Sequence, residues 1–287
     1  MYKICKNQLM QALATPRIYI ALFLGSVMQI ISVMPLFDFS RHLGRPLSIF
    51  EGFIYFNCDT YIASAAFLGF ILLVSDIPFS SQEETYILIR LSRREWISGK
   101  ILYLFIASCI YYLIIAFVGI VFILENSYFG NYWSEPIYNL VKDVGSSLAV
   151  KYNVYFPYSH ILLGLTPAKA LMASFFLSVS YGFIMSLIFF LFNLKFSRAF
   201  SYISAIMFHV IGYLLAALFT SYFYIKFSLL GNSLLMYHNI GSYYEDNLFT
   251  TLPQAFLLFF SLSVIVAFMI FKAIKQYDFR ISVGVRK

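Results

Sequence analysis

The sequence has little charge. Only 11% of its 287 residues are Asp, Glu, Lys or Arg, and 61% are hydrophobic. A soluble domain has about 25% charged and about 45–50% apolar residues. No soluble core could bury so much apolar surface, and so few charged side chains could not cover it in water. The composition therefore excludes a soluble globular domain and indicates that part of the protein surface contacts lipid.

Cysteine is also scarce, and the three that occur (Cys5, Cys58 and Cys109) lie in separate segments. This excludes a disulfide-stapled scaffold and a zinc site built from cysteines. The sequence lacks a nucleophile triad and a metal-ligating cluster. It also lacks the phosphate-binding G-x-x-x-x-G-K-[ST] loop, because Gly99-Lys100 is followed by isoleucine. We expect no catalytic site, no metal and no cofactor on this chain.

Long hydrophobic runs are what the sequence has instead. A helix needs about 20 apolar residues to cross the hydrocarbon core of a bilayer. Six stretches meet this length, with no internal repeat and no soluble domain between them. They predict an all-α membrane protein, one domain over residues 1–287, with six transmembrane helices at Ile18–Phe37, Phe53–Ser75, Ile101–Leu124, Ala168–Leu194, Ser201–Ile225 and Leu252–Ala273.

Positive charge is distributed unevenly between alternate loops. Of the 20 lysines and arginines, 14 lie at the two termini, between spans two and three, or between spans four and five. Because these residues accumulate in cytoplasmic loops, we predict cytoplasmic termini in a multi-pass plasma-membrane protein. The loops 125–167 and 226–251 are then external, and the net charge of +7 requires no nucleic-acid partner. Aromatic pairs such as Tyr128-Phe129 and Tyr132-Trp133 are interpreted as anchors in the headgroup region.

Three polar residues inside the predicted spans are candidates for a translocation path. Asn57 and Asp59 form a polar notch near the outer end of span two, and His209 lies nearer the inner end of span five. Ionisable side chains are costly in a membrane and usually face protein or a water-filled cavity. A cavity-facing or gating role and a hydrogen bond to a neighbouring helix are the two open interpretations of Asp59 and His209.

The segment 76–100 combines aliphatic residues with a definite order of charge. Glu83 and Glu84 fall in the first turn of a predicted short helix, where carboxylates oppose the positive end of the helix dipole. Arg93 and Arg94 follow at its basic end. A helix of this kind is typical of one that lies at the cytoplasmic surface and docks into a groove on a protein partner.

This segment resembles the coupling segment of type-2 ABC exporter permeases, which are membrane subunits of ABC transporters. The resemblance rests on the order Glu83-Glu84-Thr85, an aliphatic stretch, Ser92-Arg93-Arg94 and Gly99-Lys100. The family's Gly before the Thr and its Pro after the aliphatic stretch are absent. Residues 1–17 are similar to the amphipathic interfacial helix that precedes the first span in that family.

The resemblance implies the permease subunit of an ATP-driven exporter that moves a peptide, a drug or a lipid-like substrate. Its partners would be a second permease copy or a sister permease, membrane lipid, and two copies of an ABC ATPase subunit that binds ATP and Mg. Residues expected to contact the ATPase are Glu83, Glu84, Thr85, Arg93, Arg94, Gly99 and Lys100.

The loop 226–251 is expected to form an external gate. Its leucines are too apolar for open water, which predicts two short helices that dip into the outer leaflet, similar to the re-entrant helices of the same family. The gate candidates are Leu230, Leu234, Glu245 and Asp246.

Three other classes of protein remain as alternatives. A secondary transporter would need broken helices and ionisable residues near the bilayer midplane. A structural membrane protein would need no ATPase partner. An intramembrane protease is the least favoured, because Arg90 follows Glu83-Glu84 at a wider spacing than in that family's signature and His209 is the only intramembrane histidine.

Overall fold

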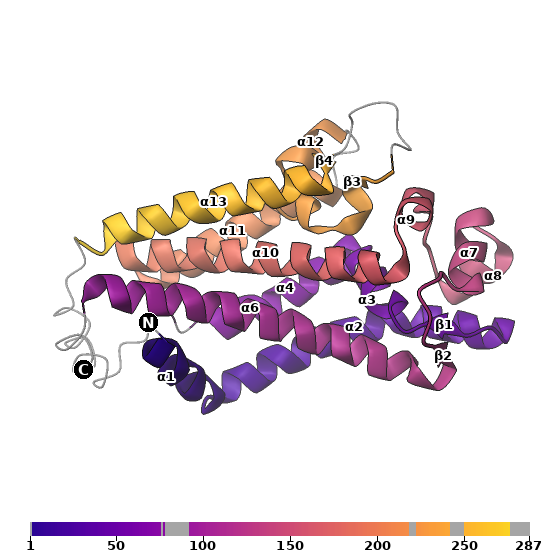
Figure 1. Ribbon diagram of the computed structural model, residues 1–287, viewed down its shortest axis with the longest axis horizontal. Helices are drawn as coiled ribbons and strands as arrows, with labels where there is room; N and C mark the ends of the chain where they lie inside the picture. Colours follow the sequence, from indigo (N-terminus) through magenta and orange to yellow (C-terminus); the bar gives the residue numbers. More distant parts are fainter. Residues whose placement is uncertain (1, 76, 78–91, 218–221, 242–249, 276–287) are drawn as a thin grey trace.

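The structure is a computed structural model, and it describes residues 2–75, 77, 92–217, 222–241 and 250–275. Long helices run side by side along its longest axis, and short elements gather at one end (Figure 1). The elements in chain order are α1 (Tyr2–Leu13), α2 (Pro16–Leu43), β1 (Leu47–Ser48), α3 (Glu51–Asn57), α4 (Thr60–Val74), α6 (Arg93–Ile123), η1 (Leu124–Asn126), β2 (Ser127–Tyr128), α7 (Glu135–Lys142), α8 (Ser147–Tyr152), α9 (Ser159–Gly164), α10 (Pro167–Lys195), α11 (Arg198–Ala217), α12 (Tyr222–Phe227), η2 (Gly231–Ser233), η3 (Leu235–Tyr237), β3 (His238–Asn239), β4 (Thr250–Thr251) and α13 (Leu252–Ala273).

Within the described residues, five helices are long and apolar enough to cross a membrane, and α3 with α4 forms a sixth candidate if a bent pair counts as one span. The chain is therefore an α-helical, multi-pass membrane protein. The predicted last span coincides with α13, and the predicted fourth span matches α10 to within one residue at each end. Which side of the membrane each loop faces stays a prediction.

Local sequence explains where these helices begin. Proline stands in the first turn of α2, α10 and α13, where its missing N–H has no intrahelical partner to lose. A capping box of Ser92 and Glu95 starts α6, so the helix begins two turns before the predicted third span. The α2 helix ends at Gly44, whose φ of 63° is the left-handed conformation that closes a helix.

Span two differs from the prediction. The expected single helix over Phe53–Ser75 is broken into α3 and α4, whose axes are bent by 92°. Asp59 lies at the break as the N-cap of α4, and its carboxylate accepts hydrogen bonds from the backbone N–H groups of Tyr61 and Ile62, at 2.9 and 3.0 Å. An aspartate that caps a following helix must leave the helical conformation itself, and this ends α3.

The described part of span five consists of α11, up to Ala217, and α12, while the residues between them lie outside the described part of the chain. The helix α10 is the centre of the bundle, because 67% of the residues in its most apolar 18-residue stretch are buried, against 17% in the corresponding stretch of α13. It packs against α6, α11 and α13, while α2 packs against α4 and α6. The predicted N-terminal helix is present as α1, which packs against α6 and buries Ile4, Cys5, Gln8 and Ala12.

The short elements close one end of the bundle. The start of α6 lies at the same end as α1, whereas α7, α8 and α9 lie at the opposite end (Figure 1). There the parallel strands β1 and β2 pair Leu47 with Ser127 and join the segment after α2 to the segment after α6. The parallel strands β3 and β4 pair His238 with Thr250.

Candidate functional site

His209 joins three helices in the interior. Its Nε2 lies 2.7 Å from the Ser64 hydroxyl on α4, and its Nδ1 lies 2.7 Å from the Tyr181 hydroxyl on α10. The imidazole stacks on Phe67, with ring centroids 4.4 Å apart. Only 2% of His209 is exposed. This arrangement matches the second interpretation of His209, a hydrogen bond to neighbouring helices, and leaves a direct role in translocation as a prediction.

Asn57 anchors the broken span at the end of α3. Its amide nitrogen donates to the Ser178 hydroxyl at 2.9 Å and to the Ser233 carbonyl oxygen at 3.4 Å. Its amide oxygen accepts the backbone N–H of Leu235 at 2.8 Å. Asn57 is 1% exposed, so these bonds replace all contact with water.

The two polar clusters follow one another along the α4–α10 interface. Ser178 and Tyr181 are three residues apart on α10, and so lie on one face of that helix. Thr60 lies one turn before Ser64 on α4, and its hydroxyl is 3.1 Å from that of Tyr237. Asn57 and His209 therefore belong to one line of interhelical hydrogen bonds, whereas Asp59 is occupied as a helix cap.

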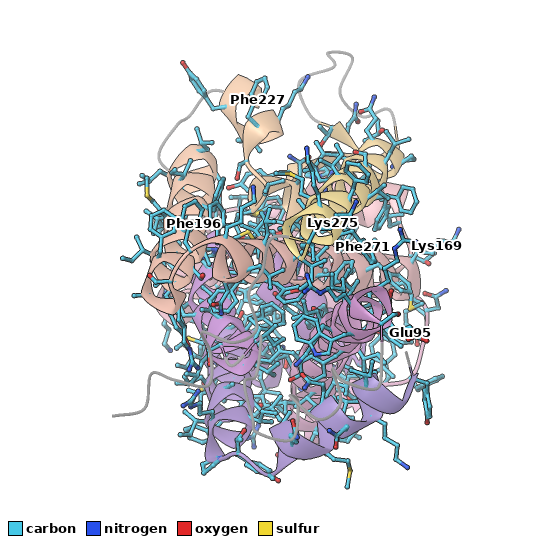
Figure 2. All side chains as sticks on the ribbon, turned by 90° about the vertical axis from the view of Figure 1, so that its left-hand side faces the viewer. Glu95, Lys169, Phe196, Phe227, Phe271 and Lys275 are labelled. Carbon is cyan, nitrogen blue, oxygen red and sulfur yellow. The ribbon has the colours of Figure 1, made fainter. Side chains whose placement is uncertain are left out.

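The first two turns of α6, residues 93–100, form the foot of this helix and contain the described part of the expected coupling segment. Arg93, Arg94, Gly99 and Lys100 lie in its first two turns, continuous with the membrane-spanning part and not on a separate helix. Glu83, Glu84 and Thr85 lie outside the described residues. Figure 2 views the bundle from this end, where Glu95 and Lys275 are labelled.

Two residues tie this foot to its surroundings. The Arg93 guanidinium donates to the carbonyl oxygens of Ile274 at 3.2 Å and Lys275 at 3.3 Å, at the end of α13. Lys100 is fully buried, and its amino group lies 5.1 Å from the centre of the Trp96 ring. The foot of span three is therefore bound to the end of the last span.

In the segment 228–240, the pair of short helices predicted for the external gate appears as two single 3₁₀ turns, η2 and η3, and the gate itself stays a prediction. Leu230 and Leu234 are 2% and 1% exposed, because this chain's own side chains cover them and no lipid is needed. Glu245 and Asp246 lie outside the described residues.

Two buried histidines hold this segment. The Nε2 of His238 faces the Asn232 carbonyl oxygen at 3.1 Å, and its Nδ1 faces that of Thr250 at 3.3 Å. The Nε2 of His160 on α9 lies 3.2 Å from the Met236 carbonyl oxygen. Burial lowers the pKa of His238 to about 4, although both carbonyls favour the charged ring. Burial also lowers the pKa of His160.

These pKa values predict that acid loosens the segment. In the docked state, His238 is buried between the carbonyl oxygens of Asn232 and Thr250, and its ring stays neutral down to about pH 4. In a released state, in which the ring is exposed to water, His238 would bind a proton below its usual pKa of 6.5. The docked state is thus fully stable above pH 6.5. Its equilibrium constant falls by up to about tenfold per pH unit between those values. Amide hydrogen exchange of residues 228–240, corrected for its intrinsic pH dependence, should be faster at pH 5 than at pH 7.5.

The control for this prediction is His42, an exposed histidine at the end of α2. His42→Gln should leave the pH dependence of exchange unchanged, while His238→Gln should reduce it. If His238→Gln retained the full pH dependence, the histidine would not be the group that senses acid.

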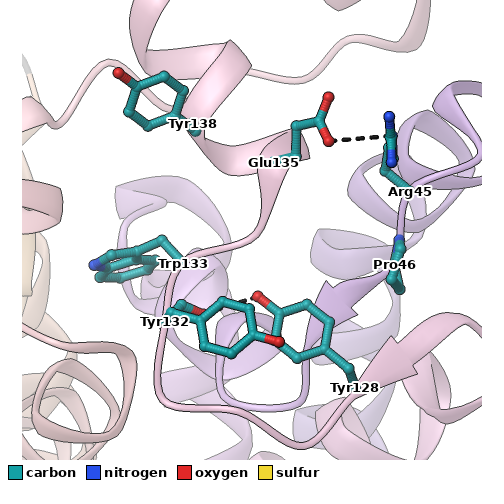
Figure 3. A pocket seen from close by; sticks show the side chains of 7 residues that line it. All are labelled: Arg45, Pro46, Tyr128, Tyr132, Trp133, Glu135 and Tyr138. Carbon is teal, nitrogen blue, oxygen red and sulfur yellow. Dashed lines mark hydrogen bonds and ion pairs between the residues drawn. The ribbon is translucent and has the colours of Figure 1, made fainter.

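A pocket of about 520 Å³ opens at the end of the bundle that carries α7 (Figure 3). The rings of Tyr128 and Tyr132 stack with centroids 4.7 Å apart. On the opposite wall Arg45 Nε and Glu135 Oε2 form an ion pair at 3.1 Å. The residues that line the pocket are Arg45, Pro46, Tyr128, Tyr132, Trp133, Glu135 and Tyr138.

The wall of this pocket is held in place by hydrogen bonds. Glu51 is 1% exposed, and its two carboxylate oxygens accept the backbone N–H groups of Ser48 at 2.9 Å and Ser134 at 2.7 Å. Ser134 in turn caps α7, on which Glu135 lies. Trp133 donates its indole N–H to the Leu165 carbonyl oxygen at 2.8 Å.

Sequence reasoning did not find this pocket. The sequence predicts that Tyr132 and Trp133 are headgroup anchors, and the structure places both on the pocket wall. The ion pair joins residues that lie ninety positions apart, and no local pattern connects them. The only signal was the density of aromatic residues between 128 and 138.

No protein-family model, no curated protein and no solved structure matches this chain. Within the described residues, no group of three or more His, Cys, Asp and Glu side chains is arranged to hold a metal ion. Its function must therefore be argued from the fold and from the sites above.

Proposed function

We propose that the chain is the permease subunit of an ATP-driven exporter and works with a separate ATPase subunit that binds ATP and Mg. The observation that carries this proposal is the pair of hydrogen bonds from Arg93 to the carbonyl oxygens of Ile274 and Lys275, just after α13. Through it, a force applied to the segment that precedes α6 would reach the last span as well as the third.

The shape of α6 supports the same function. It is one helix of 31 residues, and at 1.5 Å per residue it is about 46 Å long. A displacement of its foot would therefore be carried to the opposite end of the bundle. In this proposal the ATPase pair moves the feet of two permease copies or sister permeases. The polar interface around His209 is then the place where the helices separate to pass the substrate.

A second candidate, a secondary transporter, is favoured by one observation. The bent pair of α3 and α4 interrupts a span at a polar point, Asn57 to Asp59, and transporters of that class bind ions or substrates at interrupted helices. In this chain the Asn57 side chain is occupied by Ser178, Ser233 and Leu235. This occupation argues for a structural role of the break.

Copurification from native membranes tests the export proposal. We expect an ATPase with a Walker motif to accompany the tagged chain. The double variant Glu83→Lys, Glu84→Lys should release it, because the acidic start of the predicted coupling helix is reversed. The matched control is Glu125→Lys, at an exposed carboxylate near the end of α6 on the opposite side of the bundle.

Arg93→Gln provides a second test of this proposal. It should lower substrate-stimulated ATP turnover per bound ATPase, because the link to α13 is lost. An ATP-independent transport driven by an ion gradient, with no ATPase in the purified complex, would instead establish the secondary transporter.

A further inference from the structure

The pocket of Figure 3 has an unusual mixture of lining groups. Four of its seven lining residues are aromatic, one is proline, and the remaining two carry opposite charges. None is an aliphatic residue. By contrast, the cavity between α6, α10 and α13 is lined by phenylalanines with valine, alanine and serine, which suits a hydrocarbon chain. Aromatic faces without aliphatic side chains are typical of sites that receive an organic cation.

The pocket lies beyond the hydrophobic part of the bundle. The helix α2 continues for six residues beyond Phe37, the end of the first apolar stretch, which is about 9 Å along its axis, and Arg45 follows two residues after its end at Leu43. The headgroup layer adds roughly 5–7 Å to each side of the hydrocarbon core. The pocket is thus at the outer edge of the headgroups, where a headgroup or a dissolved molecule reaches it.

The ion pair across the pocket can be opened at small cost. The side chains of Arg45 and Glu135 are 59% and 53% exposed, and ion pairs with this exposure contribute little to stability. A ligand with one positive charge would pair with Glu135 but leave Arg45 without its partner. A ligand with one negative charge would do the reverse. A ligand that carries both charges satisfies both side chains.

We propose that this pocket binds a zwitterion of the phosphocholine type, with its alkylated ammonium among Tyr132, Trp133 and Tyr138 beside Glu135 and its phosphate at Arg45. The aromatic rings attract the ammonium through their electron-rich faces. Tyr132 and Tyr138 are 64% and 54% exposed, so their rings are available to a ligand without rearrangement. The hydrogen bonds of Glu51 and Trp133 keep the wall in place before the ligand arrives. The proposal does not depend on export.

Tryptophan fluorescence of the purified full-length chain can detect this binding. The chain has two tryptophans, and Trp96 is buried near the start of α6, at the end of the bundle opposite the pocket, so a saturable change on addition of phosphocholine would come from Trp133. We expect Tyr132→Leu and Tyr138→Leu each to raise the Kd by about tenfold. The matched aromatic control is Phe129→Leu, which is 85% exposed in the same loop and outside the pocket.

The charge variants distinguish the two halves of the ligand. Arg45→Gln should weaken the binding of phosphocholine but not that of choline, whereas Glu135→Gln should weaken both. The matched control is Arg41→Gln, four residues earlier near the end of α2, which removes a second exposed ion pair, with Glu125 at 3.9 Å. All these side chains are exposed, and size-exclusion chromatography should show every variant folded.

Two nanodisc preparations identify the source of the ligand. In phosphatidylglycerol nanodiscs, free phosphocholine should bind and change the fluorescence. If phosphatidylcholine nanodiscs abolish that change, the pocket takes the lipid headgroup; if they leave it intact, it takes a dissolved zwitterion. Both outcomes support the proposal. The proposal would be overturned if phosphocholine caused no saturable change. It would also be overturned if inorganic phosphate alone bound equally well, or if methyl glucoside bound in place of phosphocholine.

Discussion

Replacing Asn57 with leucine is expected to lower the free energy of unfolding by about 3 kcal/mol, because three buried hydrogen bonds of about 1 kcal/mol each are lost together. The backbone N–H of Leu235 and the hydroxyl of Ser178 would be left in the interior without this partner. The midpoint of thermal unfolding of the purified protein measures the effect. Amide exchange of residues 228–240 should rise in parallel, since Asn57 binds that segment to α10.

The matched control is Asp59→Asn, two residues away. Asparagine and aspartate are equally good helix N-caps, so this variant should keep the unfolding midpoint of the natural sequence. If Asp59→Asn lowered the midpoint as much as Asn57→Leu does, the carboxylate charge would have a role that helix capping does not explain. An unchanged midpoint in Asn57→Leu would show that the buried bonds do not hold the broken span.

The second large effect is expected where α2, α4 and α6 meet. Tyr111 of α6 reaches between the other two helices and donates its hydroxyl to the carbonyl oxygen of Ala66. Gly25 and Gly69 leave room for it: a Cβ at these positions would lie 2.6 and 2.7 Å from the Tyr111 hydroxyl oxygen. Gly25→Ala and Gly69→Ala should each destabilise the bundle by about 1–3 kcal/mol, the usual cost of overpacking.

A double substitution separates the two glycines. Tyr111→Phe removes the atom nearest to both, and should restore much of the stability of Gly69→Ala, whose next contact is the Ala21 carbonyl oxygen at 3.1 Å. It should not restore Gly25→Ala, because its Cβ would still lie 2.8 Å from Ile115 Cδ1.

The control for these overpacking variants is Gly212→Ala on α11. Its new Cβ would meet Leu230 at an ordinary 3.4 Å. The same unfolding midpoint in all of these glycine variants would contradict the proposed packing.

The long helices were predictable from the sequence because two local signals coincide there. An apolar run of sufficient length begins beside a proline that suits the first turn, as at Pro167 and in α13. The capping box at Ser92 is equally local, but the prediction began span three at Ile101, where the polar residues end. Helical hydrogen bonds extend past that point, because a helix does not need to stop at the edge of the hydrocarbon.

The break in span two could not be predicted from hydrophobicity, because the residues on both sides of it are apolar. Asp59 carries the signal, but an aspartate inside an apolar run fits a pathway residue as well as an N-cap. Only the contacts of Asn57 with α10 and with residues 233–235 select the bent form, and those partners lie more than a hundred positions away.

Composition and charge by themselves determined that this chain crosses a membrane as a helical bundle, because each span must satisfy its own backbone hydrogen bonds and carry its own apolar surface. They could not tell whether Leu230 and Leu234 face lipid or protein, since both surroundings are equally apolar. The tertiary structure buried both leucines within the chain. It also assembled the aromatic pocket, because Arg45 and Glu135 meet only after α2 and α7 are packed at the same end of the bundle.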